Sequence, residues 1–217
     1  MNKTLNTLIL PILAAPLAYL ALVWNKLPEK VAIHFNLEGT ADDFGSKQEL
    51  VLMAVILTAV NAGVYLLLNN IYRIDPKRGA GENKSRLQKI GFAVCVFVSA
   101  MLCMIIYTSM HTGKKFNTQF IFAAVGLLFS FIGNYMHTLK PNYFAGLRLP
   151  WTLENEDNWR KTHFLAGKLF FAGGLLIAVI CLFTPVIFSI IAFFTICTII
   201  VVIPCIYSYK LYKQHQQ

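Results

Sequence analysis

The chain has 217 residues, of which 57% are hydrophobic and only 13% are charged, whereas a soluble domain usually carries about 25% charged residues. This composition excludes an ordinary globular protein and predicts that nearly the whole chain lies in a membrane. The formal net charge is +9. Because Lys and Arg lie mainly between the apolar runs, they meet lipid headgroups first, and no direct nucleic-acid partner is expected.

Six apolar runs are long enough to cross a bilayer, since a hydrocarbon core of roughly 30 Å needs about 20 residues of helix. They cover residues 5–24, 50–72, 90–110, 117–136, 164–183 and 186–209. The first run is too long for the apolar region of a signal peptide, so it is counted as a helix. The last two runs are separated at Thr184-Pro185, because proline removes a backbone donor and disfavours helix in the preceding residue.

The basic residues between the runs predict the orientation. Thirteen Lys and Arg fall in the N-terminus, the 73–89 loop, the 137–163 loop and the C-terminal tail, against five on the other side. Under the positive-inside rule both termini are therefore cytoplasmic. The prediction is an all-α, multi-pass membrane protein with six transmembrane helices, built from two three-helix halves, residues 1–116 and 117–217.

Residues 25–49 form a long loop on the predicted outer side of the first half. Apolar residues alternate over residues 31–35, which predicts a short extended segment, and the glycines predict turns. His34, Asp42 and Asp43 could coordinate a cation, but their irregular spacing is more typical of a hydrogen-bonded loop, so neither a metal nor a cofactor is expected. The candidate contact residues for a ligand of this loop are His34, Asn36, Gly39, Asp42, Gly45 and Lys47.

Residues 137–163 form the long inner loop of the second half. A short helix is predicted to begin near Thr152 through a capping arrangement. On such a helix, Trp151 and Trp159 would share a face and lie on the headgroup layer. The candidate residues of this inner surface are Asn134, Lys140, Asn142, Gly146, Arg148, Pro150, Trp151, Trp159, Thr162 and His163.

Arg148 separates the interpretations of this inner loop. A free guanidinium would bind an anion, either a lipid phosphate or an acidic segment of a partner. A buried guanidinium would brace the bundle by pairing with Glu154 or Asp157. In a third interpretation the loop is an interfacial helix that only seals the bundle.

Polar residues inside the predicted spans are few. Hydrogen bonds between helices explain Asn61, Ser99 and Ser130. No Asp, Glu or Arg lies in the middle of a span, as an ion or proton relay would need. No nucleophile motif surrounds a Ser or Cys, so no catalytic residue is assigned and the chain is not expected to be an enzyme.

The two loops carry a family resemblance. The motif of the inner loop resembles the signature of the SdpI family of bacterial immunity proteins, through Gly133-Asn134-Tyr135-Met136, Lys140-Pro141-Asn142-Tyr143-Phe144, Gly146, Arg148, Pro150-Trp151-Thr152-Leu153, Trp159 and Thr162-His163. The outer loop resembles the N-terminal domain of uncharacterised function that accompanies it, through Pro28, His34-Phe35-Asn36, Gly39, Asp42, Gly45 and Lys47. The chain departs from the expected pattern at Ala41, His137, Leu149 and Phe164.

The resemblance implies a six-helix protein of the bacterial cytoplasmic membrane that protects its cell from a secreted, membrane-active peptide toxin. It also implies that such a protein can hold a cytoplasmic transcriptional repressor at the membrane. The expected partners are thus membrane lipid, a peptide toxin and a repressor. The competing hypothesis is a membrane enzyme or small-molecule transporter with a polar site at the inner helix ends, which a nucleophile beside His163 would favour.

Overall fold

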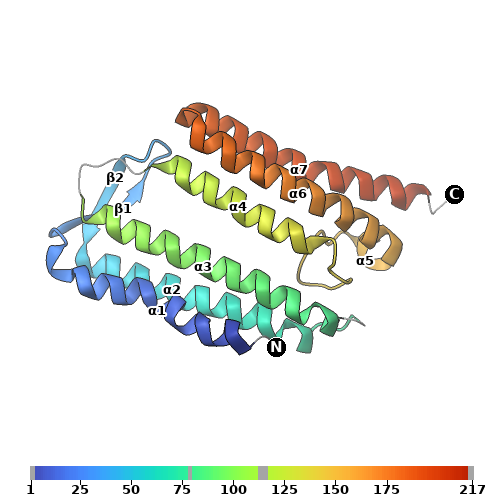
Figure 1. The fold of residues 1–217 in the computed structure, drawn as a ribbon, viewed down its shortest axis with the longest axis horizontal. Coiled ribbons are helices and arrows are strands. Elements are labelled where there is room, and N and C mark those ends of the chain that lie inside the picture. Colours follow the sequence, from blue (N-terminus) through green and yellow to red (C-terminus); the bar gives the residue numbers. More distant parts are fainter. Residues whose placement is uncertain (1–2, 78–79, 112–116, 215–217) are drawn as a thin grey trace. The chain divides into compact units, whose positions relative to one another are not determined.

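The computed structural model describes residues 3–77, 80–111 and 117–214, and its main elements are helices (Figure 1). Six of them are long and apolar enough to cross a membrane. They are α1 (Lys3–Val23), α2 (Lys47–Asn70), α3 (Lys84–Ser109), α4 (Thr118–Met136), α6 (Glu156–Phe183) and α7 (Val186–Gln214). The predicted six-helix fold is confirmed, including the break at Thr184-Pro185.

The orientation of the helices in the membrane stays a prediction. Arg78, Lys114 and Lys115, which contribute to the charge count, lie outside the described residues.

Six short elements connect the long helices. They are η1 (Trp24–Lys26), β1 (Lys30–Phe35), β2 (Ala41–Ser46), η2 (Ile71–Arg73), η3 (Ala80–Asn83) and α5 (Pro150–Glu154). The predicted extended segment is therefore correct, and it forms the first strand of a two-stranded antiparallel hairpin.

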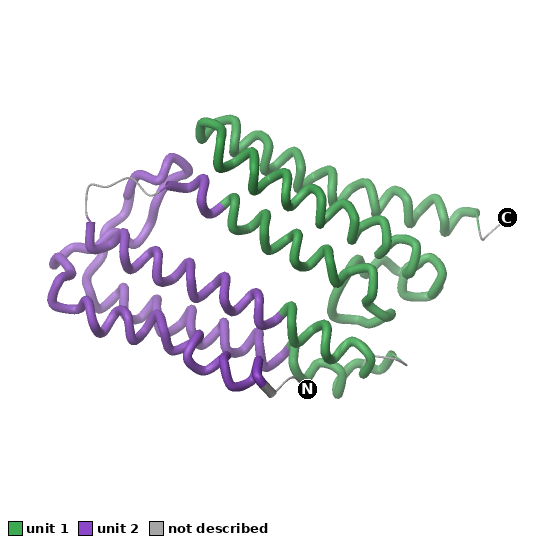
Figure 2. Tube along the Cα trace, viewed as in Figure 1, with its two compact units in different colours: residues 1, 68–90, 122–217 green, residues 2–67, 91–121 purple. Residues whose placement is uncertain are grey.

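The chain divides into two compact units (Figure 2). The hairpin unit contains residues 2–67 and 91–121, which include α1, the hairpin and most of α2 and α3. The loop unit contains residues 68–90 and 122–217, which include the adjoining ends of α2 and α3 together with α5, α6, α7 and most of α4. The division of the chain into halves at residue 116 stays a prediction.

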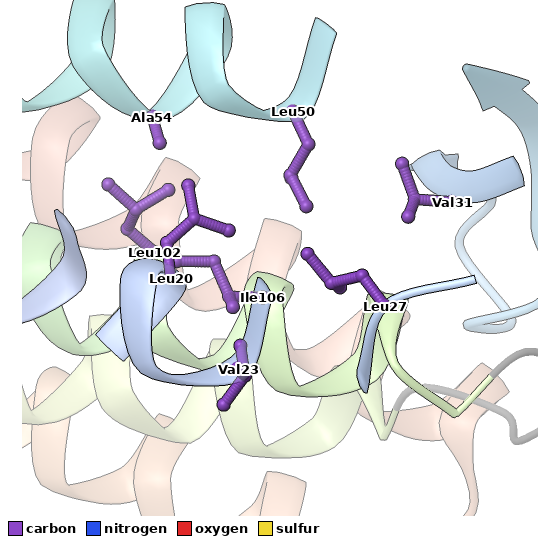
Figure 3. Close-up of a cluster of buried hydrophobic side chains, with 8 residues drawn as sticks. All are labelled: Leu20, Val23, Leu27, Val31, Leu50, Ala54, Leu102 and Ile106. Carbon is purple, nitrogen blue, oxygen red and sulfur yellow. The ribbon is translucent and has the colours of Figure 1, made fainter. Parts of the chain in front are cut away.

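The hairpin is anchored to the helices of its unit by an apolar cluster. Figure 3 shows the cluster, which contains Leu20, Val23, Leu27, Val31, Leu50, Ala54, Leu102 and Ile106. Val31 of β1 and Leu50 of α2 are both fully buried. The hydroxyl of Ser109 in α3 also donates to the carbonyl of Ala32 at 2.8 Å. Buried apolar area and this hydrogen bond together fix β1 against α2 and α3.

The predicted hydrogen bonds between helices are present. In the hairpin unit, Asn61 Nδ2 donates to the carbonyl of Cys95 at 3.2 Å and to Ser99 Oγ at 3.3 Å. In the loop unit, Ser130 Oγ donates to the carbonyl of Phe171 at 2.8 Å.

Two pairs of glycines bring α4 and α6 into backbone contact. A Cβ on Gly126 would lie 2.6 Å from the carbonyl oxygen of Gly174, and a Cβ on Gly167 would lie 2.9 Å from that of Gly133. Such distances are too short for a side chain, and small residues allow this close approach of membrane helices.

Candidate functional site

The turn of the hairpin is built by two of the residues singled out in the sequence. Asn36 Oδ1 accepts hydrogen bonds from the backbone N–H groups of Glu38 and Thr40, each at 3.0 Å. Gly39 has a φ of 78°, which side chains disfavour and glycine adopts freely. Asn36 and Gly39 therefore shape the loop, and this explains their presence without a ligand.

The base of the hairpin is joined directly to α2. Ser46 Oγ accepts from the backbone N–H of Glu49 at 3.2 Å, and Glu49 Oε2 accepts from that of Ser46 at 2.9 Å, which is a reciprocal capping box. A Cβ on Gly45 would collide with the Glu49 carboxylate. Lys47 Nζ lies 3.3 Å from Glu29 Oε1 and 5.7 Å from the centre of the Trp24 ring. Gly45 and Lys47 thus also have structural roles.

The remaining two candidates, His34 and Asp42, form an exposed pair across the strands. His34 Nδ1 lies 2.6 Å from Asp42 Oδ1, and the two side chains are 67% and 43% exposed. Leu37 and Phe44 are also half-exposed or more, at 58% and 50%. We call these four residues the hairpin surface, and they combine a charged pair with apolar side chains.

Asp43 does not join His34 and Asp42 in a cation site. Its carboxylate accepts from the backbone N–H of Phe44 at 2.9 Å. Among the described residues, no group of three His, Cys, Asp or Glu is placed to hold a metal ion.

In the loop unit, Asn142 organises the 137–163 loop from within. It is 1% exposed. Its Oδ1 accepts from the N–H groups of Phe144 and Ala145, at 3.0 and 2.7 Å, and its Nδ2 donates to the carbonyls of Lys140 and Ala145, at 2.9 and 3.1 Å. The whole hydrogen-bonding capacity of one amide is therefore used inside the loop.

His163 and Trp159 form the buried centre of the same loop. His163 is fully buried, and its Nε2 accepts from the backbone N–H of Leu147 at 3.0 Å. Its Nδ1 lies 2.9 Å from the carbonyl of Trp159, so this nitrogen carries the proton. The two rings stack with centroids 3.9 Å apart, and the indole N–H of Trp159 donates to the carbonyl of Leu139 at 2.7 Å.

The short helix α5 differs in detail from its prediction. It begins with Pro150, which suits the first turn of a helix because its missing N–H needs no partner there. Thr152 does not precede the helix as a cap but lies inside it, where its hydroxyl accepts from the N–H of Leu149 at 2.9 Å and donates to the carbonyl of Leu147 at 2.8 Å. The helix ends at Glu154, and the side chain of the next residue, Asn155, caps α6 instead.

The prediction that Trp151 and Trp159 share one helix face on the headgroup layer is wrong, because Asn155 is extended and separates α5 from α6. Trp151 of α5 instead donates to Ser208 Oγ of α7 at 3.0 Å and stacks on Tyr212, with centroids 5.6 Å apart. Trp159 of α6 is only 1% exposed.

Thr162 belongs to the contact between α6 and α7. Its hydroxyl donates to Asn158 Oδ1 at 2.9 Å, and Asn158 Nδ2 donates to the carbonyl of Ser208 at 2.9 Å. We call residues 139–163 the loop platform.

Comparison with known protein families gives one match for the loop platform and one for the hairpin. Residues 138–208, which contain the loop platform, match the SdpI/YfhL protein family. Residues 138–208 are an SdpI-family domain. Residues 1–58, which contain the hairpin, match a domain of unknown function (DUF1648). The family resemblance predicted from the two motifs is thus confirmed.

A curated relative is similar along almost its full length. The chain is 23% identical over 194 residues to "Immunity protein SdpI" of Bacillus subtilis (strain 168). The aligned region covers 89% of this chain and 88% of that protein. No solved structure matches the chain.

The SdpI-family domain is fastened to the 73–83 segment by residues that the sequence alone did not single out. Asn83 clamps the backbone of Lys140: its Nδ2 donates to the carbonyl at 3.0 Å, and its Oδ1 accepts from the N–H at 2.8 Å. Asp75 Oδ2 accepts from the N–H of Tyr143 at 3.0 Å, and Lys77 Nζ donates to the carbonyl of Leu153 at 2.6 Å. Asp75 is the one carboxylate of residues 73–78, and this isolated acid was the signal available in the sequence.

Arg148 is an exposed residue of the motif in the SdpI-family domain. Its Nη1 donates to the carbonyl of Tyr143 at 2.7 Å. The predicted pairing with Glu154 or Asp157 is not found, because the Asp157 carboxylate is bound by Arg160 at 2.8 Å and by Lys161 at 2.6 Å. A buried brace is therefore the wrong interpretation of Arg148.

Asn134 lies apart from the loop platform. It is exposed on α4 and takes no part in the hydrogen bonds that hold the loop.

Proposed function

We propose that this chain is a membrane immunity protein, resident in the bacterial cytoplasmic membrane, that protects its cell from a secreted, membrane-active peptide toxin. The observation that carries the proposal is the extent of the similarity to an immunity protein, which covers 89% of this chain and 88% of the relative. The similarity therefore includes both the hairpin and the loop platform rather than one of them.

The hairpin surface is the proposed contact with the toxin. Its turn, its base and its attachment to α3 are each fixed by hydrogen bonds, so the exposed His34, Leu37, Asp42 and Phe44 are held in place before a ligand arrives. A rigid surface of this kind binds without a large loss of conformational entropy. Its half-exposed Phe44 and Leu37 suit an amphipathic peptide, and its charged pair supplies specificity.

The loop platform is the proposed contact with a cytoplasmic transcriptional repressor. Tyr143 and Phe144 remain 44% and 37% exposed beside Arg148, although the buried Asn142 binds the backbone of Phe144. Tyr, Phe and Arg are the residue types enriched at protein interfaces. An acidic segment of the partner would complement Arg148.

The competing hypothesis of an enzyme has less support. Both ring nitrogens of His163 are engaged by backbone groups, the N–H of Leu147 and the carbonyl of Trp159. Neither nitrogen is placed to take a proton from a substrate or a nucleophile.

Expression in a toxin-sensitive bacterium tests the proposal. Cells that carry the chain, or the empty vector as a control, are challenged with secreted membrane-active peptides purified from bacteria that carry SdpI-family genes. Survival should rise with the chain for at least one peptide. If no peptide discriminates between the two strains, while immunoblotting finds the chain in the membrane, the immunity proposal fails.

A further inference from the structure

A groove lies between α4 and α6 where the backbone contact of Gly133 and Gly167 leaves its floor without side chains. Its volume is about 240 Å³. Three of its lining residues, Asn134, His137 and Lys168, can donate hydrogen bonds. Phe164 and Phe171 of α6 line the rest. The groove therefore has a polar part and an apolar part.

Lys168 is a cation without a counter-charge inside a membrane-spanning helix. It is exposed, and its ammonium lies 4.2 Å from the centre of the Phe164 ring. Within the part of the chain that the structure describes, no carboxylate lies within ion-pair distance of it. Lys168 stands fifteen residues before the last residue of α6, Phe183, which is about 22 Å along the helix.

This depth places Lys168 at the edge of the hydrocarbon. With Phe183 at one boundary of a core of roughly 30 Å, the backbone of Lys168 lies inside the core near the other boundary. A cation at this depth is costly unless its side chain extends to the headgroups or meets an anion. No described carboxylate pairs with Lys168, so an anion that meets it would come from outside the described chain.

His137 and Asn134 lie at the same level as Lys168. A Cβ on Gly167, the residue before Lys168, would be 3.2 Å from the backbone nitrogen of His137. His137 and Asn134 are both exposed, and neither side chain forms a hydrogen bond with another described residue. Three unused donors thus gather at the depth where lipid phosphates lie.

We propose that this groove binds an anionic phospholipid. Its phosphate accepts hydrogen bonds from Lys168, His137 and Asn134, and an acyl chain lies along Phe164 and Phe171. Charge complementarity favours an anionic lipid over a zwitterionic one. The apolar side favours a lipid over free phosphate, because inorganic phosphate leaves Phe171 uncovered. This binding site goes beyond the proposed immunity function and does not depend on it.

Native mass spectrometry of the purified full-length chain in detergent tests the site. The probes are dioleoyl phosphatidylglycerol and dioleoyl phosphatidylcholine, and wild type should bind the first more tightly. Lys168→Gln should weaken phosphatidylglycerol binding about fivefold, because one basic residue near a membrane surface contributes about that much. Lys213→Gln is the matched control: Lys213 is also exposed on a long helix, with its ammonium 5.3 Å from the centre of the Tyr209 ring. It should leave binding unchanged.

Two further measurements keep the result interpretable. His137→Ala, at the exposed residue that follows α4, should also weaken phosphatidylglycerol binding, which covers the case in which Lys168→Gln does not fold. Millimolar inorganic phosphate should not displace the lipid. Equal affinities for the two lipids, equal losses in Lys168→Gln and Lys213→Gln, unchanged binding in both groove variants, or full displacement by phosphate would each overturn the proposal.

Discussion

Gly146 lies against the imidazole of His163, so closely that a Cβ at position 146 would overlap Nε2 of the ring. The φ of Gly146 is 101°, a conformation that side chains rarely adopt. The next residue, Leu147, donates its N–H to that same Nε2 at 3.0 Å. Two independent requirements, one of space and one of backbone conformation, therefore select glycine at this position.

Gly146→Ala should destabilise the loop platform. The strained backbone alone costs about 1–3 kcal/mol, and the displaced imidazole loses its hydrogen bond to Leu147. The melting temperature of the purified protein in detergent should fall clearly below that of wild type. Gly63→Ala is the control, because a Cβ at Gly63 in α2 meets nothing within 4 Å. It should stay within about 1 kcal/mol of wild type, and equal melting temperatures for the two variants would contradict the packing described for Gly146.

Asp42→Ala should reduce protection against the toxin without reducing the amount of protein in the membrane. Asp42 contacts His34 in an exposed pair, and exposed pairs contribute little to folding stability. Survival after toxin challenge and immunoblotting of membranes measure the two quantities. Glu38→Ala removes another exposed carboxylate of the same hairpin and should leave protection intact. A parallel loss of protein and protection in Asp42→Ala would make Asp42 a structural residue.

Arg148→Lys should weaken recruitment of a cytoplasmic partner more than it weakens folding. Lysine keeps the charge but loses the planar, two-pronged donor geometry of the guanidinium. Arg148 is exposed and holds the carbonyl of Tyr143, so the melting temperature should change little. Co-purification of the repressor with membranes gives the readout. Wild-type recruitment by the lysine variant would leave Arg148 as an ordinary residue of the basic side.

The orientation is open to a direct measurement. Reporters fused after Arg78 and after Gln217 should read cytoplasmic, and one inserted between Gly39 and Ser46 should read external. The reason is the excess of basic residues, thirteen against five, on one side of the six helices. An external reading at Gln217 would reverse the assignment of both loops.

The six spans could be predicted from the sequence because a bilayer imposes a length and a composition that few other structures share. The break at Pro185 followed from the length of the last apolar stretch, which is too long for one span, and from the effect of proline on its own and the preceding residue. These predictions needed no knowledge of what each helix packs against, and they agree with the structure.

The contacts of the loop platform could not be predicted in the same way. Asn155 separates α5 from α6, and a local pattern that favours helix on both sides of it does not reveal the break. Asn83 and Asp75 bind backbone groups of Lys140 and Tyr143, which are more than fifty residues away in the chain. Only the folded structure shows which backbone groups a polar side chain meets.

The roles of the glycines in the 25–49 loop could be predicted only in part. Their freedom of backbone conformation predicted turns, and Gly39 does occupy one. Gly45 has a different role, because the Glu49 carboxylate lies in the space that a Cβ would occupy. The sequence alone could not separate a residue chosen for its backbone conformation from one chosen for the space beside it.

Ser46 ends β2 and at the same time caps α2, so no spare residue stands between the strand and the helix. One inserted residue after Ser46 would turn α2 by about 100° about its own axis relative to the hairpin. Leu50 and Ala54 would then face away from Val31, with which they now form one apolar cluster. The number of residues at this junction therefore sets the orientation of the hairpin relative to α2. An insertion or deletion there would be tolerated far less than most substitutions.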